Sequence, residues 1–157
     1  MMTSQASRNY AGRSIDLCYI PKLETLSRSR VQLAFGNDPT VCTGVEKLVQ
    51  WVVNILMTIR GSDPYRPDYG TLFMEELSTG QAVTDDEAMA AFGEATLYIL
   101  EYFAENVLQN DTPADEVLKD LGGYIIEYDG YTMKMAIEIS TNEDDLTVIV
   151  PIPLVIK

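Results

Sequence analysis

The chain of 157 residues contains no histidine and only two cysteines, Cys18 and Cys42. The lack of imidazole excludes a histidine-based catalytic triad and a mixed Cys/His metal site. The two cysteines lie in different segments, and nothing else in the sequence indicates an oxidising compartment. We therefore expect two buried thiols, with a disulfide or a redox pair as the alternative.

Long apolar runs are also missing. No stretch approaches the ~20 apolar residues that a membrane-spanning helix needs, and the polar N-terminus, MMTSQASRNYAGRS, lacks the apolar core of a secretory signal. We expect no membrane partner and action in the compartment where the chain is made. Its length suits one domain that buries roughly two-thirds of its unfolded surface.

Basic residues are scarce and unevenly distributed. The net charge is −13, of which residues 1–62 contribute +3 and residues 63–157 contribute −16. An acidic surface of this kind repels phosphates of nucleic acid and anionic membranes. The charge favours either plain solubility or a basic protein partner, and the sequence leaves both open.

Residues 1–43 form an N-terminal arm that we separate from a main domain of residues 44–157. Alternating apolar and polar residues in SIDLCYI and RVQLAF predict two short strands, joined by the polar sequence PKLETLSRSR. Turn-forming residues at 36–39 close the arm.

Two capping boxes mark two helices. Thr43-x-x-Glu46 precedes an apolar helix over about residues 44–59, and Thr84-x-x-Glu87 opens a helix over about residues 85–109. The first is apolar on nearly all sides, including Trp51, so it is either an internal core helix or a helix shared with another chain. The second has a core stripe and an acidic stripe, and the acidic stripe is either solvated or a dock for a basic partner. The acidic stripe comprises Glu87, Glu94, Glu101 and Glu105.

Residues 58–77 connect the two helices and are predicted to form a rigid corner. Proline fixes φ and glycine permits positive φ, so a segment with both is shaped rather than flexible. The sequence LFMEEL at its end predicts a short helical turn, and Tyr65 and Tyr69 stand within it as candidate contacts for partners. The corner residues are Gly61, Pro64, Pro67 and Gly70.

The C-terminal third predicts a mainly antiparallel, three-stranded sheet. Residues 124–128, an Asp129-Gly130 turn of type I′ and the alternating residues from Tyr131 onward give a hairpin. A third strand follows the acidic turn NEDD, and Pro151 and Pro153 on its other register predict an edge strand there. Such an edge invites exchange with a partner strand. The apolar register of this strand comprises Leu146, Val148, Val150, Ile152, Leu154 and Ile156.

Taken together, the patterns predict an α+β fold in which two main helices pack on the three-stranded C-terminal sheet, with a small N-terminal β arm. Candidate catalytic groups are limited to neighbouring acids at residues 75–76, 85–87 and 144–145. Neighbours in sequence do not supply two carboxyls across a cleft. No phosphate-binding loop or metal-ligand spacing is present, so we expect no enzyme, no metal and no cofactor.

The segment TIRGSDPYRPDYG, residues 58–70, between an apolar helix and a short amphipathic turn, resembles the signature of contractile-tail baseplate wedge proteins that act as sheath initiators. This family also carries a lysozyme-like name and includes a baseplate component of type VI secretion systems. Further matches follow in order: Leu72, Phe73 and Leu77, the long helix, the YDGYT hairpin and the NEDDL turn. The resemblance covers about residues 44–156.

The resemblance implies a structural role. Such proteins bind wedge proteins through their helices and offer the C-terminal sheet to the first ring of sheath subunits, whose terminal strands extend it. It implies a place in the virion tail baseplate, assembled in the host cytoplasm, in several copies around the tube and hub proteins. Trp51, Tyr65 and Tyr69 would contact wedge partners, and the strand from Leu146 to Ile156 would contact the sheath.

One departure stands out. Family members carry a Glu-Pro-Arg triplet between the long helix and the sheet, whereas this chain reads NDTPADEVLKDLGG there. Two alternatives from other classes also remain: a peptidoglycan hydrolase, as the family's name suggests, and an acidic adaptor that binds a basic protein.

Overall fold

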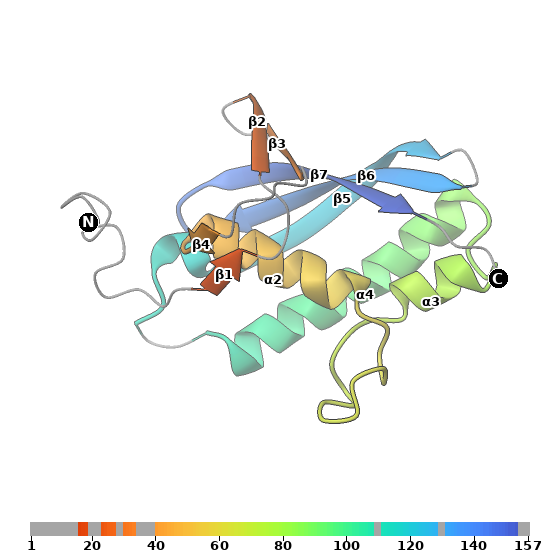
Figure 1. Ribbon diagram of the computed structural model, residues 1–157, viewed down its shortest axis with the longest axis horizontal. Helices are drawn as coiled ribbons and strands as arrows, with labels where there is room; N and C mark the ends of the chain where they lie inside the picture. The colour runs from red at the N-terminus through yellow and green to blue at the C-terminus, as the bar shows by residue number, and fades with distance from the viewer. Residues whose placement is uncertain are drawn as a thin grey trace.

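The computed structural model describes residues 16–18, 23–27, 30–33, 40–108, 111–128 and 131–153, with side chains from residue 42 onward. Helices lie together on one face of a five-stranded sheet whose strand order is β2-β3-β7-β6-β5 (Figure 1). The predicted α+β fold, with helices on a C-terminal antiparallel sheet, is confirmed. The helical elements are α2 (Val45–Met57), α3 (Phe73–Ser78), α4 (Asp85–Asn106) and the 3-10 turn η1 (Ala114–Glu116).

The C-terminal strands form an antiparallel meander, in which β6 lies between β5 and β7. The alternation predicted from Tyr131 onward is confirmed from Met133 to Ile139, because Met133, Met135, Ile137 and Ile139 are at most 1% exposed. These residues contribute to one hydrophobic core with the helices. Tyr131 itself is 76% exposed, and Ala136 on the opposite register is also buried. The three strands are β5 (Leu118–Tyr128), β6 (Thr132–Thr141) and β7 (Asp145–Pro153).

Strand β5 begins six residues before the predicted strand at 124. Adjacent glycines are common in turns, but Gly122 and Gly123 both lie within β5, opposite Glu138 and Ile137. A Cβ at Gly123 would stand 2.6 Å from the Ala136 carbonyl oxygen and 3.0 Å from the Phe92 ring. Glycine is therefore required here by close packing rather than by a turn.

The predicted hairpin between β5 and β6 is present. Its last paired residues are Tyr128 and Met133, so four residues, 129–132, lie between them instead of the two of a type I′ turn. The Asp129-Gly130 pair itself lies outside the described residues.

Both strands predicted in the N-terminal arm are present, as β1 (Asp16–Cys18) and β3 (Arg30–Leu33). Two more were not predicted: β2 (Leu23–Ser27), within the supposed polar connection, and β4 (Thr40–Cys42), which pairs with β1. Strand β3 pairs in parallel with β7. Part of the arm therefore belongs to the same sheet as the main domain.

Helix α2 is largely internal. Eight of its thirteen residues are buried, including the polar Lys47 and Gln50, which supports the interpretation as a core helix. Trp51 and Met57 remain half-buried, so contact with another chain at these positions stays open. The buried state predicted for Cys42 is confirmed, whereas the side chain of Cys18 is outside the described part of the chain.

The capping boxes have opposite outcomes. At α4 the box is confirmed: the Thr84 hydroxyl accepts from the Glu87 N–H at 3.2 Å, and the Glu87 carboxylate accepts from the Thr84 N–H at 3.0 Å. At α2 the predicted box is wrong, because Gly44 is the N-cap, at φ 64°, and no local side chain caps the helix. No helix in the described ranges is long and apolar enough to cross a bilayer.

Candidate functional site

The corner after α2 is closed by backbone hydrogen bonds across its base. The Thr71 N–H donates to the Thr58 carbonyl at 2.9 Å, and the Arg60 N–H donates to the Thr71 carbonyl at 3.0 Å. Gly70, directly before Thr71, adopts φ 100°. A Cβ added at this residue would lie only 2.5 Å from the Thr58 carbonyl oxygen. Any side chain at residue 70 would therefore strain the closure of the corner, and glycine avoids this strain.

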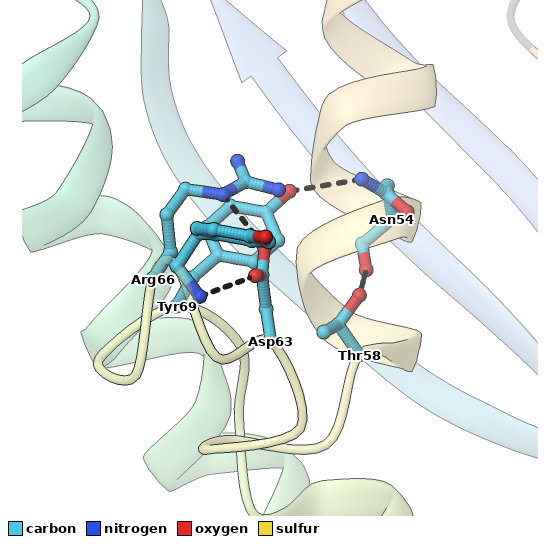
Figure 2. Close-up of polar contacts among 6 residues, drawn as sticks. Asn54, Thr58, Asp63, Arg66 and Tyr69 are labelled. Atoms are coloured by element: carbon cyan, nitrogen blue, oxygen red, sulfur yellow. Dashed lines mark hydrogen bonds and ion pairs between the residues drawn. The ribbon is translucent and has the colours of Figure 1, made fainter.

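Asp63 organises the loop of the corner (Figure 2). Its carboxylate accepts hydrogen bonds from the Tyr65 N–H and from Arg66 Nε, both at 2.9 Å. The Tyr65 N–H and the Arg66 side chain hold the pKa of Asp63 below its ordinary value of 3.8. Pro64 and Pro67 are exposed at the surface of this loop, and Gly61 enters it at φ 81°.

Tyrosines fasten the corner to both long helices. Tyr69 is buried, and its hydroxyl accepts from Asn54 Nδ2 of α2 at 2.9 Å (Figure 2). Its ring packs edge-on against Tyr102 of α4, with centroids 5.6 Å apart. The Tyr98 hydroxyl of α4 donates to the Asp68 carbonyl. Burial raises the pKa of Tyr69, which keeps this phenol neutral in ordinary buffers.

The three tyrosine and tryptophan positions expected to contact wedge proteins divide into two groups. Tyr65 is 92% exposed at the tip of the corner. Trp51 and Tyr69 instead line one cavity. The structure therefore brings two of the three candidates together and places the third on the outer surface.

The cavity has a volume of about 650 Å³ and lies between α2, the end of α4 and the segment that leads to η1. Its wall is aromatic on one side, with Trp51, Tyr69 and Tyr102. Sequence patterns did not indicate this cavity, because its lining comes from four separate segments. The remaining lining residues are Lys47, Asn54, Ile55, Arg66, Asn106, Val107, Asp111, Thr112, Pro113 and Glu116.

Two of the lining residues, Lys47 and Glu116, form a buried ion pair. Lys47 Nζ lies 2.5 Å from Glu116 Oε2, and the two side chains are 3% and 7% exposed. The other carboxylate oxygen, Oε1, accepts from the Gly44 N–H at 2.8 Å. Glu116 thus occupies the N-terminus of α2 in place of the predicted Thr43 box, where a negative charge also suits the helix dipole. The pair is explained by helix capping, so we assign it no catalytic role.

The acid pairs considered as catalytic candidates are distributed over three elements. Glu75 and Glu76 lie in the first turn of α3, and Asp85 and Asp86 lie in the first turn of α4. Asp144 lies in the turn between β6 and β7, and Asp145 is the first residue of β7. None of them lines the cavity, and no cluster of acids or cysteines in the described ranges has the composition of a metal site.

The edge predicted for the third strand is only partly correct. Strand β3 pairs with Thr147, Val148 and Ile149 of β7, so this part of β7 is interior to the sheet. Beyond Ile149 no described residue pairs with β7 on the side of β3, so from Val150 to Pro153 the described pairing of β7 is with β6 alone. Val148, Val150 and Ile152 are buried in the core and Leu146 packs against it. Leu154 and Ile156 lie outside the described residues.

The acidic stripe of α4 is on the surface: Glu94, Glu101 and Glu105 are all exposed. Arg60 stands over the Tyr98 ring beside it, at 5.0 Å from the ring centroid. A solvated face and a dock for a basic partner are both consistent with this geometry.

No protein-family model matches the chain, and no curated protein matches it at a significant level. The function must therefore be argued from the residues and from the geometry described above.

Proposed function

We propose that the chain is a structural component of a contractile-tail baseplate, where it joins wedge proteins to the tail sheath and initiates sheath assembly by β-strand addition to its C-terminal sheet. The observation that carries the proposal is the combination of the TIRGSDPYRPDYG corner with a C-terminal sheet that has open backbone edges in the described residues. An open edge is the surface on which a partner strand is added.

The corner supports this role because it links the two expected contact regions rigidly. Hydrogen bonds from Asn54 to Tyr69 and from Tyr98 to Asp68 fasten it to α2 and α4. Both helices pack on the sheet through one hydrophobic core. A partner held at the corner would therefore have a fixed orientation relative to a partner held at the sheet.

Wedge proteins would contact the exposed Tyr65 and the cavity walled by Trp51 and Tyr69. Aromatic side chains beside a cavity are typical anchor positions at protein interfaces. The chain would be present in several copies in the virion baseplate, near the tube and hub proteins, and would assemble in the host cytoplasm. The proposal includes no enzyme activity, no cofactor and no contact with nucleic acid or membrane.

The direct test is removal of the chain from particles that contain it. We expect baseplates without sheaths in electron micrographs, and re-supply of the chain should restore sheaths. Truncation within β7 is unsuitable, because Val148, Val150 and Ile152 are core residues and their loss would unfold the domain. Truncation after Pro153 preserves β7 and tests whether residues 154–157 are needed for sheath assembly. Sheaths of normal length on particles that lack the chain would refute the proposal.

The wedge contact has its own test. Tyr65→Ala removes a side chain that is 92% exposed, so the melting temperature should stay unchanged while incorporation into baseplates falls. Tyr131→Ala is the matched control, since Tyr131 is 76% exposed on another part of the surface. Equal incorporation of both variants would remove Tyr65 from the interface.

A muralytic assay separates this proposal from a peptidoglycan hydrolase. The purified chain is expected to release no peptidoglycan fragments. Activity that disappears in Glu75→Gln or Glu76→Gln would favour the hydrolase instead.

A further inference from the structure

Among the described residues the C-terminal sheet has two edges without a neighbouring strand, the part of β7 beyond Ile149 and the outer side of β5, and they differ in the backbone groups that they present. On β7 the ladder with β6 runs through Pro151 and Pro153. Proline has no N–H, so these two positions must be the ones whose backbone points away from β6. The open part of β7 thus offers carbonyl oxygens and no amide donors at Pro151 and Pro153. A partner strand would make only half of the usual hydrogen bonds there.

The outer side of β5 is different. Among the described residues β6 alone pairs with β5, which is the outermost strand and eleven residues long. The same alternation that turns Pro151 outward from β6 turns the backbone groups of Leu121, Gly123 and Ile125 away from β6. The Leu121 N–H donates to the Asp120 carboxylate at 2.9 Å, as expected for an N–H outside the ladder. By this alternation Gly123 and Ile125 present both donors and acceptors at this edge, up to the irregularity of the ladder between Ile125 and Glu127.

Helix α4 extends the apolar surface beyond β5. Met89, Gly93, Leu97, Leu100 and Ala104 recur at three and four residues and share one flank of α4, which we call the α4 flank. Leu97 is 70% exposed, and a Cβ at Gly93 would meet nothing within 4 Å.

The residues on the opposite side of α4 indicate where the α4 flank lies. Tyr98 and Tyr102 lie there and contact the corner and Tyr69, on the side of α2. Of the sheet strands, β5 makes the most contacts with α4. The α4 flank therefore lies on the far side from α2, next to the outer edge of β5, where it could support one further strand.

Charge indicates the composition of that strand. Asp120, near the start of β5, and Glu138, opposite Gly122, lie on the face of the sheet turned away from the helices. Lys134, opposite Glu127, is on the same face, and residues 63–157 carry a net charge of −16. Side chains of an added strand alternate between the α4 flank and this acidic face. Apolar side chains of the added strand suit the α4 flank, and basic side chains suit the acidic face.

We propose that the outer edge of β5, together with the α4 flank, binds an extended segment of another protein in which apolar residues alternate with lysine or arginine. The proposal rests on the proposed function for the source of that segment, a sheath subunit. It replaces the β7 edge as the place of strand addition. The acidic stripe of α4, beyond the flank, adds to the attraction for a basic segment.

The test uses the full chain and a fluorescein-labelled ten-residue peptide in which valine alternates with lysine. Fluorescence anisotropy should show saturable binding, and a peptide with glutamate in place of lysine should bind at least about tenfold more weakly, since like charges repel. Ile125→Pro removes an outward N–H that β6 does not use. Ile125→Ala is its control, because it removes the same side chain and keeps the donor.

Ile125→Pro should bind the lysine peptide about tenfold more weakly than Ile125→Ala. Leu97→Gln, which removes exposed apolar surface without changing charge, should weaken binding several-fold. Val83→Gln, at a position of comparable exposure outside the flank, 62% against 70%, should not. Circular dichroism establishes that each variant is folded. If Ile125→Pro does not fold, the Leu97→Gln and Val83→Gln pair decides.

Equal affinity of Leu97→Gln and Val83→Gln, or no binding of the lysine peptide to the wild-type chain, would overturn the proposal. A dimer in sedimentation that Ile125→Pro dissociates would assign the edge to a second copy of this chain and would also overturn it. Peptide binding by a chain that is absent from virions would refute the baseplate role and leave the edge intact. A chain present in baseplates that binds no peptide would refute the edge alone.

Discussion

Replacement of Gly70 tests whether the corner is as tightly constrained as its geometry indicates. Alanine at φ 100° incurs a conformational cost of about 1–2 kcal/mol. Its Cβ would also stand 2.5 Å from the Thr58 oxygen. That oxygen must move and weaken its bond to the Thr71 N–H, for about 1 kcal/mol more. We expect Gly70→Ala to lower the free energy of unfolding by about 2–3 kcal/mol in total, which lowers the melting temperature by about 4–12 °C.

Gly80 provides the matched control. It also has a positive φ, 73°, but a Cβ there would meet nothing within 4 Å. Gly80→Ala should therefore show the conformational cost alone, about 1–2 kcal/mol. Thermal and urea denaturation followed by circular dichroism measure both variants. If Gly70→Ala is no less stable than Gly80→Ala, the corner relaxes easily and the argument is wrong. Gly70→Val should in addition impair assembly, and normal assembly would argue against an orienting role for the corner.

Two further predictions concern the helix N-termini. Glu116→Ala removes the carboxylate that pairs with the buried Lys47, so it should lower the free energy of unfolding, measured in urea, by about 3–5 kcal/mol. Glu116→Gln should lower it less, because its amide oxygen still accepts from the Gly44 N–H. Equal stability of Glu116→Ala and wild type would contradict this prediction. Hydrogen bonds from the Thr84 and Val83 N–H groups lower the pKa of Glu87 below its ordinary value of 4.5, so its contribution is fully present above pH 4.5 and is lost as the pH falls through the lowered pKa. The difference in melting temperature between wild type and Glu87→Gln should therefore shrink below pH 4.5, and a difference that stays constant into strong acid would show that the charge of Glu87 is irrelevant.

Local patterns in the sequence predicted local structure well. The Thr84 box is formed by residues three apart, so it depends on nothing outside its own turn. The alternation in β6 likewise identifies its buried face, since that face is set by the period of two. The same kind of pattern failed at Thr43, because Glu116, 72 residues beyond Gly44, supplies the cap.

Interactions between distant segments explain the other differences. The pairing of β3 with β7 is parallel and spans more than a hundred residues, and no local pattern specifies it. The start of β5 at Leu118 was not predicted, since the sequence cannot show that Phe92 lies close to Gly123. The cavity beside Trp51 was missed for the same reason. Tyr65 and Tyr69, four residues apart in the same corner, differ in exposure because Tyr69 alone meets α2 and α4.

Electron cryomicroscopy of the assembly that contains this chain tests the central claim most directly. The account predicts the chain in the baseplate, with an extended strand of a sheath subunit continuing its C-terminal sheet at the outer edge of β5. A baseplate without the chain, or a sheath that adds no strand to any edge of this sheet, would contradict it.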